Sequence, residues 1–417
     1  MAELKRTTGS LDERIALVQA NADALRSRGL AHQVAEDGEF DGRHITLAGR
    51  RVVHFGSCSY LGLETDVRLK VGACEAVMRW GTQFSSSRAY VSAPPYAELE
   101  RLLRRMVGEL PLVLAPTTTL GHQAALPLLL ARGDAVLFDV QVHSSVQAVL
   151  PALKQQGIPC APVGHGRLDQ VERKARALVR SHARVFYLCD GVYSMHGDCV
   201  DVPELFGLLD RVPELFAYVD DAHGVGWAGR HGAGVVLGEH GIHARMAVAL
   251  GLAKGFAAGG AALVFADPNA ARRVFSCGGP MVFSGPLQPA QLGAAIASAK
   301  ILLSPELAAL QAAVRERIAL FDVLAAGEGL WVRSSQPTPI RFVEIGDEDQ
   351  TVELGARLLA AGYYANVAVY PAVPRRRAGL RMMLSARHEP GDIEGLLRAL
   401  GSLRRGLAGK GAGAVPV

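Results

Sequence analysis

Two short segments hold the residues best suited to chemistry, and each follows an apolar run. The first run, residues 215–219, leads to Asp220 and His223. The second run, residues 246–252, leads to Lys254 among small residues. If both runs are buried strands, they deliver an acid, an imidazole and an amine to the same edge of a sheet. That set suits pyridoxal phosphate. The amine can form a Schiff base, the carboxylate can keep the pyridine nitrogen protonated, and the imidazole can bond the ring oxygen.

Asp220 has a second carboxylate, Asp221, directly beside it. Successive side chains of a strand point to opposite faces, so only one of the two can face a cofactor ring. We expect that one to be Asp220, with His223 as its companion. Loop capping is the structural alternative for this pair, and a surface position is the alternative for Lys254. Burying a lysine in an apolar stretch without a partner is costly, which favours a functional role.

Three further groups could contact the cofactor. His143 follows a predicted strand and could stack on the ring, or it could be an ordinary loop histidine. Ser194 lies in a glycine-punctuated loop and could donate to a ring oxygen. Thr118 and Thr119 stand where a loop meets the start of a helix, which suits a phosphate monoester. Threonines at such a position also serve as plain helix caps.

Composition narrows the classes of function. The chain of 417 residues is long enough for a large domain and a smaller one, and 49% of its residues are hydrophobic. A formal net charge of +4 with 20% charged residues is too mild to indicate nucleic-acid binding. The GxGxxG spacing at 224–229 is a weak dinucleotide signal, because the residues after it are too rich in glycine to open a helix.

Cysteine usage and apolar stretches bear on the compartment. The 6 cysteines are scattered without a CxxC pair, so we expect reduced thiols and no metal site. The polar segment 1–6 lacks the apolar core of a signal peptide. Residues 110–131 are uncharged and long enough to span a bilayer, but their prolines and polar side chains would leave backbone groups unsatisfied in lipid. We interpret them as a strand end, a turn and a buried helix, and expect a cytoplasmic protein that does not bind membranes.

Apolar strands alternate with helices along the middle of the chain. This alternation is typical of an α/β fold with a mostly parallel sheet covered on both faces, where ligands bind beyond the carboxyl ends of the strands. An alanine-rich segment, 289–324, predicts a long helix. We expect an N-terminal helix and hairpin segment (1–55), a large cofactor-binding domain (56–300) and a small C-terminal α+β domain (301–417). Strands are predicted at 135–138, 185–188, 216–219, 246–250 and 260–265, and helices at 11–29, 67–80, 96–107, 144–156 and 202–209.

Motifs spread from His54 to Leu403 resemble the α-oxoamine synthase family, within the fold-type-I pyridoxal-phosphate enzymes. Each motif alone is moderate support, but their order and spacing together are specific. The matching segments are Ser59–Leu63 (N-Y-L-G-L in the family), Ser87–Arg88 with Leu99–Glu100 (G-S-R…H-x-x-L-E), Gly191–Met195 with Gly197–Asp198 (G-V-F-S-M-D-G-D), Val219–His223 (V-D-E-A-H), and Pro371–Pro374 with Leu380–Ala386, His388 and Asp392–Ile393 (the C-terminal signature).

The resemblance implies a large domain with a mostly parallel seven-stranded sheet and helices on both faces, plus a smaller α+β C-terminal domain. It also implies a homodimer with the active site at the subunit interface. The implied reaction joins an amino acid to an acyl thioester, either an acyl-CoA or an acyl-carrier protein. It releases CO2 and a free thiol and leaves an α-amino ketone.

Residue roles are carried over from the family to the matching positions. Lys254 is expected to form the Schiff base and to move the α-proton, and Asp220 to pair with the pyridinium nitrogen. His143 is expected to stack on the ring, while His223 and Ser194 hold the ring oxygen. These five residues form the expected centre of the site.

The expected substrate contacts lie elsewhere in the sequence. Arg381 resembles the arginine that grips the substrate carboxylate, where a planar guanidinium fits well. Ser59 and Tyr60 are expected to line the substrate pocket. The basic run 375–377 could bind the phosphates of CoA or pantetheine, or it could be a solvated basic loop.

The sequence departs from the family pattern mainly around the phosphate. Thr118 and Thr119 occupy the place of a Ser-Gly-aromatic loop, and His122 stands where asparagine is usual. Gly251 stands where a threonine binds phosphate. In the family a neighbouring subunit contributes through an F-S/T-T segment, of which only Ser284 remains here. We therefore expect the phosphate contacts to be redistributed.

Three hypotheses for the function stay open on the sequence. The first is the decarboxylative condensation. The second is another pyridoxal-phosphate reaction, namely an aminotransferase, lyase or aldol-type reaction, because the outcome depends on which α-carbon bond stands perpendicular to the ring. The third is a non-enzymatic subunit that has kept the fold, which the intact Lys254, Asp220 and His223 disfavour.

Overall fold

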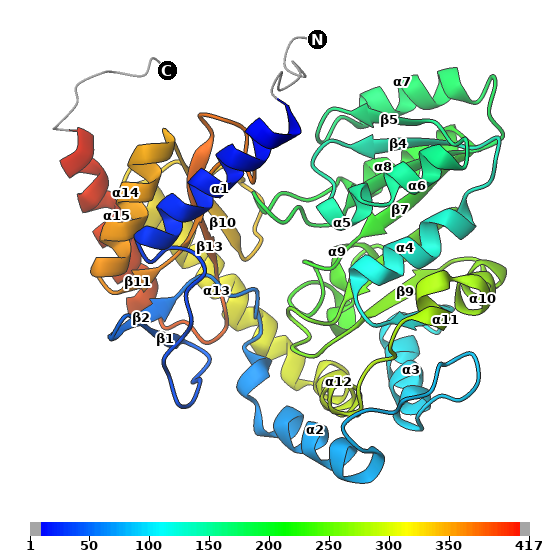
Figure 1. Cartoon of the computed structure of the whole chain (residues 1–417), viewed down its shortest axis with the longest axis horizontal. Helices are drawn as coiled ribbons and strands as arrows, with labels where there is room; N and C mark the ends of the chain where they lie inside the picture. Colours follow the sequence, from blue (N-terminus) through cyan, green and yellow to red (C-terminus); the bar gives the residue numbers. More distant parts are fainter. Residues whose placement is uncertain (1–9, 409–417) are drawn as a thin grey trace. The chain divides into compact units, whose positions relative to one another are not determined.

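The structure is a computed structural model that describes residues 10–408. Packing divides the chain into two compact units (Figure 1). The larger unit is Cys58–Arg315, and the smaller one joins Met1–Ser57 to Glu316–Val417. The boundaries at 55 and 300 that the sequence suggests stay a prediction. The polar segment 1–6 lies outside the described residues.

The larger unit is built on a seven-stranded sheet in the order β3-β9-β8-β7-β6-β4-β5. Strand β9 pairs antiparallel with both β3 and β8, whereas the other neighbours pair parallel. The prediction of a mostly parallel sheet is therefore confirmed. The strands are β3 (Leu112–Ala115), β4 (Ala135–Asp139), β5 (Cys160–Val163), β6 (Val185–Asp190), β7 (Leu215–Asp220), β8 (Met246–Gly251) and β9 (Ala261–Phe265).

Helices cover both faces of this sheet (Figure 1). Helix α4 contacts β3, β8 and β9, while α7 contacts β4 and β6, and α8 contacts β7. The uncharged segment 110–131 forms β3, a turn and the largely buried α4, as predicted. The helices of this unit are α2 (Val67–Trp80), α3 (Pro95–Met106), α4 (Thr118–Leu129), α5 (Ser144–Gln147), α6 (Leu150–Gln155), α7 (Leu168–Leu178), α8 (Val202–Arg211), α9 (Gly234–Leu237), α10 (Pro268–Cys277), α11 (Gly279–Phe283), α12 (Pro289–Leu302) and the start of α13 (Glu306–Gly327).

Two predicted helices are broken by proline. The segment 144–156 forms α5 and α6, and Pro151 lies in the first turn of α6. The segment 289–324 forms α12 and α13, with Pro305 between them. Proline has no N–H to donate to the preceding turn, but it is tolerated at a helix start. The prediction of one continuous helix was therefore wrong for both segments, since each forms two helices.

The smaller unit is α+β, as expected. Its two three-stranded sheets have the orders β1-β2-β11 and β10-β13-β12. Helix α1 begins at a capping box in which Ser10 and Glu13 bond each other's backbone N–H. The elements are α1 (Leu11–Ser27), β1 (His44–Leu47), β2 (Arg50–His54), the rest of α13, β10 (Ile340–Gly346), α14 (Glu348–Ala360), β11 (Tyr363–Tyr364), β12 (Asn366–Ala368), β13 (Ala378–Met383) and α15 (Pro390–Ala408).

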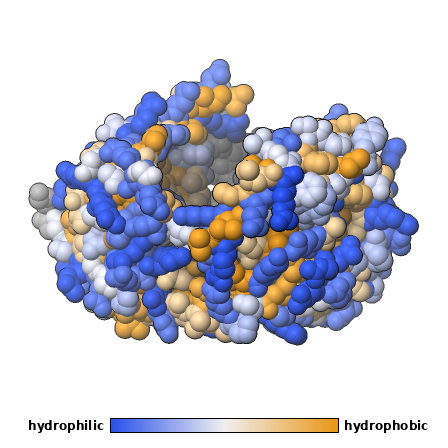
Figure 2. All heavy atoms as spheres, turned by 90° about the horizontal axis from the view of Figure 1, so that it is seen from below, coloured by the Kyte–Doolittle hydropathy of each residue, from blue (hydrophilic) through white to orange (hydrophobic). Residues whose placement is uncertain are grey.

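The described helices do not include one long and apolar enough to cross a membrane alone. Taken together, α12 and α13 have the length and composition, but the pair is bent by 86° at its break. One face of the molecule, shown in Figure 2, mixes hydrophobic residues with hydrophilic ones.

An ion cluster ties the end of β4 to the loop that carries Ser194. The imidazole of His165 binds the carboxylate of Asp139 through Nδ1 at 3.1 Å and that of Asp198 through Nε2. The hydroxyl of Tyr193 also donates to Asp139, at 3.0 Å. Burial opposes a charge on His165, but the two carboxylates outweigh it and raise its pKa to about 9. The cluster therefore holds the loop with a charged histidine at neutral pH.

This cluster predicts a pH-dependent stability. The folded pKa of His165, about 9, lies above the ordinary histidine value of 6.5, so its contribution to stability is complete below pH 6.5 and is lost as the pH rises through 9. The shift corresponds to at most about 3 kcal/mol. We expect the difference in unfolding free energy between wild type and His165→Gln, measured by denaturant titration, to shrink between pH 6 and pH 10. The exposed-site variant His240→Gln should show no such trend, and a constant difference for His165→Gln would contradict the role of the cluster.

Candidate active site

The carboxyl ends of β6, β7 and β8 bring the predicted acid and amine together. Asp190 and Asp220 are register partners on β6 and β7, and Asp220 lies beside Ala249 of β8. Lys254 follows β8 within a few residues, and its charge lowers the pKa of both carboxyl groups. Among residues 10–408, the Lys254 ammonium has no hydrogen-bond or ion-pair partner. The arrangement places the Lys254 amine within electrostatic reach of a buried acid.

Asp220 is buried and held from two sides. Its Oδ2 lies 3.0 Å from Nε2 of His122, and its Oδ1 accepts the backbone N–H of Ala222 at 3.1 Å. Burial disfavours the charged form, but His122 and Lys254 outweigh that effect and lower the pKa of Asp220. Asp220 is therefore a carboxylate that can accept a hydrogen bond from a protonated ring nitrogen.

Asp221 has a different environment. Its Oδ2 accepts the N–H of Val236 at 3.0 Å, while its Oδ1 has no partner among the described residues. A Cβ on Gly224 or Gly234 would lie within 2.2–2.3 Å of its carboxylate oxygens, so both positions need glycine. Burial raises the pKa of Asp221 well above its usual range. Asp221 is thus a neutral structural acid beside the charged Asp220.

His143 begins α5 next to the acid of the neighbouring strand. Its backbone N–H donates to Oδ1 of Asp190 at 3.0 Å, and its Nδ1 lies 2.6 Å from the hydroxyl of Ser145. Burial, together with the charge of Asp220, raises the pKa of Asp190 well above its usual range. Asp190 therefore fixes the backbone of His143 and adds no second negative charge.

His223 is paired with a residue from far along the chain. The hydroxyl of Tyr60 lies 2.7 Å from its Nδ1, and the indole N–H of Trp227 donates to its carbonyl at 2.6 Å. Both rings of the Tyr60–His223 pair are buried. The neighbouring Ser59 donates to Glu64. Two of the residues expected in the cofactor and substrate sites thus form one hydrogen-bonded unit.

The start of α4 offers backbone donors for a phosphate. Thr117 is the N-cap residue, and its hydroxyl accepts the N–H of Leu120 at 3.1 Å. Thr118 and Thr119 form the first helical turn, where backbone N–H groups lack partners inside the helix. The plain-cap role therefore belongs to Thr117, and the two predicted threonines remain available to an anion.

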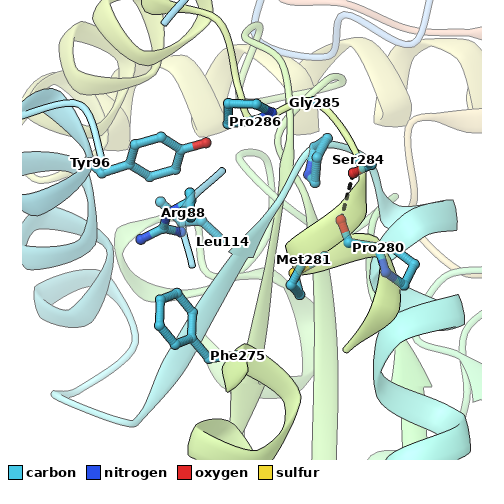
Figure 3. Close-up of a pocket in the computed structure, with 10 residues that line it drawn as sticks. Arg88, Tyr96, Leu114, Phe275, Pro280, Met281, Ser284, Gly285 and Pro286 are labelled. Carbon is cyan, nitrogen blue, oxygen red and sulfur yellow. Dashed lines mark hydrogen bonds between the residues drawn. The ribbon is translucent and has the colours of Figure 1, made fainter. Parts of the chain in front are cut away.

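Ser284 lies in a small pocket of its own (Figure 3). Its hydroxyl donates to the carbonyl of Pro280 at 2.5 Å. The Arg88 guanidinium in the same pocket stacks 3.8 Å from the ring centre of Tyr96 and pairs with Glu100 at 2.7 Å. Neither Lys254 nor Asp220 lines this pocket, so within one chain Ser284 is not grouped with them.

Two expectations fall outside this group of residues. Arg381 lies on β13 of the smaller unit, and its role in binding substrate stays a prediction. Ser194 lies half-buried in the loop held by the His165 cluster, and its contact with the cofactor also stays a prediction. Over residues 10–408, no group of three or more His, Cys, Asp or Glu side chains could hold a metal ion.

Sequence reasoning noted His122 only as a departure from the family and assigned it no role. The structure makes it the main partner of Asp220, and it is fully buried. A signal was present, because a histidine in a mostly apolar helix without charged residues must find a polar partner when it is buried. What the sequence could not show is which strand residue that partner is.

The residues present fit pyridoxal phosphate. A charged, buried carboxylate can face its ring nitrogen, an unpartnered lysine can bind its aldehyde, and a helix N-terminus can take its phosphate. These three features match the three polar ends of one cofactor. A bare acid or a bare amine would not account for all of them.

Comparisons with known proteins agree with this site. The sequence model of the family described as aminotransferase class I and II matches residues 50–400. The 8-amino-7-oxononanoate synthase of Anaeromyxobacter dehalogenans is 30% identical over 396 residues, which covers 93% of this chain and 95% of that protein. The protein of the same name from Thermoanaerobacter pseudethanolicus is 26% identical over 391 residues, covering 92% and 95%.

Solved structures show the same fold. Serine palmitoyltransferase of Sphingomonas wittichii aligns with a TM-score of 0.86 at 22% identity, over 95% of this chain and 99% of that one. An 8-amino-7-oxononanoate synthase from Francisella tularensis aligns with a TM-score of 0.73 at 19% identity, over 85% and 98%. The chain therefore has the fold-type-I architecture and belongs to the aminotransferase class I and II family, as a pyridoxal-phosphate-dependent acyltransferase of the α-oxoamine synthase type.

Proposed function

We propose that this enzyme condenses an amino acid with an acyl thioester, releasing CO2 and a free thiol and forming an α-amino ketone. The observation that carries this proposal is that the charge of Lys254 lowers the pKa of the buried Asp220, in a chain that covers 95% of an 8-amino-7-oxononanoate synthase. The non-enzymatic hypothesis loses its support, because the chain is an enzyme of this family.

The names of the relatives support the reaction class. An 8-amino-7-oxononanoate carries its amino group on the carbon next to the ketone, so it is itself an α-amino ketone. A serine palmitoyltransferase, by its name, moves an acyl group onto an amino acid. Both activities form a bond between an acyl carbonyl carbon and an amino acid. The identity of the two substrates of this chain does not follow, since sequence identity is 30% or less.

The reaction balances with the groups proposed for the site. The bond from the α-carbon to the carboxyl group breaks and a bond from the α-carbon to the acyl carbon forms. The bond from the acyl carbon to sulfur breaks, and the thiolate that leaves takes a proton from water. Bound pyridoxal phosphate supplies an electron-withdrawing ring that lowers the cost of negative charge at the α-carbon. Asp220 accepts a hydrogen bond from the ring nitrogen, and Lys254 takes the α-proton and later returns it.

The remaining proposed roles concern binding. His143 stacks on the ring, and His223 with Ser194 holds the ring oxygen. The backbone N–H groups of Thr118 and Thr119 hold the phosphate. The substrate is bound by Arg381 through its carboxylate, with Ser59 and Tyr60 lining the pocket. The positions of His143 at the start of α5 and of Thr118 and Thr119 in the first turn of α4 support the assignments of these three residues.

The thioester is either an acyl-CoA or an acyl-carrier protein. The exposed basic run Arg375–Arg377 supports a phosphate-bearing partner, since both carriers present a phosphate next to pantetheine. Arg377 is also paired with Glu344 at 2.9 Å, which ties part of the run into the fold. Condensation assays with acyl-CoA and with acyl-carrier protein as the acyl donor distinguish these two substrates.

A condensation assay with a lysine variant tests the proposal. Purified enzyme is incubated with each amino acid and a panel of acyl-CoA and acyl-carrier thioesters, and free thiol and CO2 are measured. We expect equal amounts of both products for one amino acid. The variant Lys254→Ala should lose the cofactor absorbance band at the edge of the visible and at least about 10²-fold to 10⁴-fold of the rate. Borohydride reduction should leave cofactor mass on the peptide that contains Lys254.

The matched control is Lys154→Ala, which removes an exposed lysine from the same unit and should leave the spectrum and rate unchanged. Dependence on a keto acid, or release of ammonia without thiol, would replace condensation by an aminotransferase or lyase reaction. A cofactor band that persists unchanged in Lys254→Ala would overturn the assignment of the lysine.

We also propose that the enzyme is a homodimer with its active site at the subunit interface, to which the partner contributes Ser284. Helix α2 supports this proposal because it is apolar on two opposite sides. Leu69 and Ala76 are buried on the side of the helix opposite three exposed apolar residues. Those residues, Val67, Val71 and Met78, are 67%, 48% and 86% exposed and share one helical stripe.

The variant Met78→Arg tests this interface. A charge in an apolar interface costs more than the roughly 1.5–3 kcal/mol gained by burying methionine, so we expect the dimer to dissociate. Light scattering after size exclusion should report one chain mass in place of two. The control Val34→Arg places the same charge at an equally exposed site on the smaller unit and should leave the mass unchanged. A dimer that survives Met78→Arg would move the interface away from α2.

We propose a cytoplasmic location. The 6 cysteines are all unpaired, which suits a reducing compartment.

A further inference from the structure

The imidazole of His122 lies between two side chains of β7 and is fully buried. Its Nε2 is 3.0 Å from Oδ2 of Asp220, and its Nδ1 is 2.8 Å from the hydroxyl of Tyr218. Tyr218 and Asp220 are two residues apart on the strand, so both point to the same face of the sheet. Helix α4 supplies the histidine from its second turn. The catalytic and binding roles proposed above are not given to His122 or Tyr218.

We propose that His122 is a positioning residue which, held by Tyr218, keeps the Asp220 carboxylate charged and directed at the pyridine nitrogen of pyridoxal phosphate. The inference rests on the cofactor and does not depend on the condensation. It assigns a task to the buried side chains of His122 and Tyr218. Packing alone does not favour polar groups there, because a buried polar side chain costs free energy unless its hydrogen bonds are made.

The hydrogen-bonding rules fix where the imidazole proton lies. A carboxylate only accepts, so Nε2 must carry a hydrogen to bond Asp220. In the neutral imidazole, Nδ1 is then an acceptor, and the Tyr218 hydroxyl donates to it. In the protonated imidazole, both nitrogens donate and the Tyr218 oxygen accepts. Both forms keep the hydrogen on Nε2, and the tautomer with its only hydrogen on Nδ1 would turn a lone pair towards Asp220.

The two donors on Asp220 set its orientation and leave capacity for the cofactor. His122 occupies Oδ2, and the N–H of Ala222 occupies Oδ1 at 3.1 Å. Each carboxylate oxygen has a second lone pair, so the group can still accept the ring N–H. Donors on both oxygens restrict rotation of the carboxylate plane. The ring nitrogen then meets an acceptor that is already aligned, which lowers the ordering cost of binding.

The charges facing Asp220 come from every element around it. His122 lies on α4 and Lys254 after β8, and both lower the pKa of Asp220. Asp190 on β6 and Asp221 after β7 both have pKa values raised well above the usual range, through burial and the charge of Asp220. The acid at the centre is therefore the charged one of three neighbours. Removal of His122 removes the side chain which, among residues 10–408, donates a hydrogen bond to the Asp220 carboxylate.

Cofactor binding and the protonation of its ring nitrogen test the proposal without any substrate. The variants are His122→Phe, which keeps a ring but no N–H, His122→Asn, which keeps a donor, and Tyr218→Phe, which loses only the hydroxyl. The control Tyr187→Phe removes a buried hydroxyl from the neighbouring strand β6. Each protein is titrated with pyridoxal phosphate to obtain Kd. Solid-state nitrogen-15 resonances of ring-labelled cofactor report whether the nitrogen is protonated.

We expect His122→Phe to raise the Kd of the cofactor about tenfold to one-hundredfold, by analogy with the range found for groups that orient metal-binding residues. The ring nitrogen should lose its proton in a measurable fraction of sites. His122→Asn should recover part of both properties, and Tyr218→Phe should raise Kd by less than His122→Phe. Tyr187→Phe should match wild type in both measurements.

The outcomes separate a positioning role from a structural one. Wild-type Kd and ring protonation in His122→Phe would overturn the proposal. If His122→Phe does not fold, as judged by circular dichroism, the proposal is tested by His122→Asn and Tyr218→Phe. Wild-type Kd and ring protonation in both of these variants would then overturn it. Variants that lower the melting temperature but leave the nitrogen resonance at the wild-type position would show a structural role only. Because no substrate enters these experiments, a failed condensation assay leaves their result intact.

Discussion

A carboxylate that stays charged inside the protein is the constraint on which this site depends. Asp220 is only 5% exposed, and burial of a charge is costly unless specific partners stabilise it. The partners are His122 from α4, the backbone N–H of Ala222 just after β7, and the charge of Lys254 after β8. Each of them comes from a different segment, so the larger unit must fold as a whole before the buried acid has all the partners that keep it charged.

The two neighbouring acids, Asp190 and Asp221, are subject to the same cost of burying a charge. Three carboxyl groups at adjacent strand ends cannot all be charged in one buried region, because like charges at short range raise each other's pKa. Asp190 and Asp221 accordingly take the neutral form. Each then has a structural task, Asp190 with the backbone of His143 and Asp221 with that of Val236. The strand order β8-β7-β6 produces this difference in charge. It places Lys254, which follows β8, on one side of Asp220 and the neutral Asp190 at the end of β6 on the other.

Sequence patterns predicted those elements whose apolar residues form a continuous run or recur with an unbroken helical period. The buried strands β6 to β9 and the helix α2 follow directly from such patterns. The edge strand β5 was missed because it is short and contains Pro162, and the helix breaks were missed because a helical pattern continues through Pro151 and Pro305. In the site, motifs predicted residues near strand ends, but not His122, since its partner is 98 positions away and only the fold brings the two together.

The departure at Gly251 follows from the same close packing. A Cβ at this position would lie 2.7 Å from Cβ of Ala222, the residue whose N–H holds Asp220. A threonine at 251 would therefore displace the backbone that orients the acid. With glycine there, β7 and β8 can end in close contact, but the strand end loses a hydroxyl that could bind phosphate. This loss supports the proposal that the phosphate is held mainly by backbone donors at the start of α4, where Thr117 caps the helix and leaves the next N–H groups for an anion.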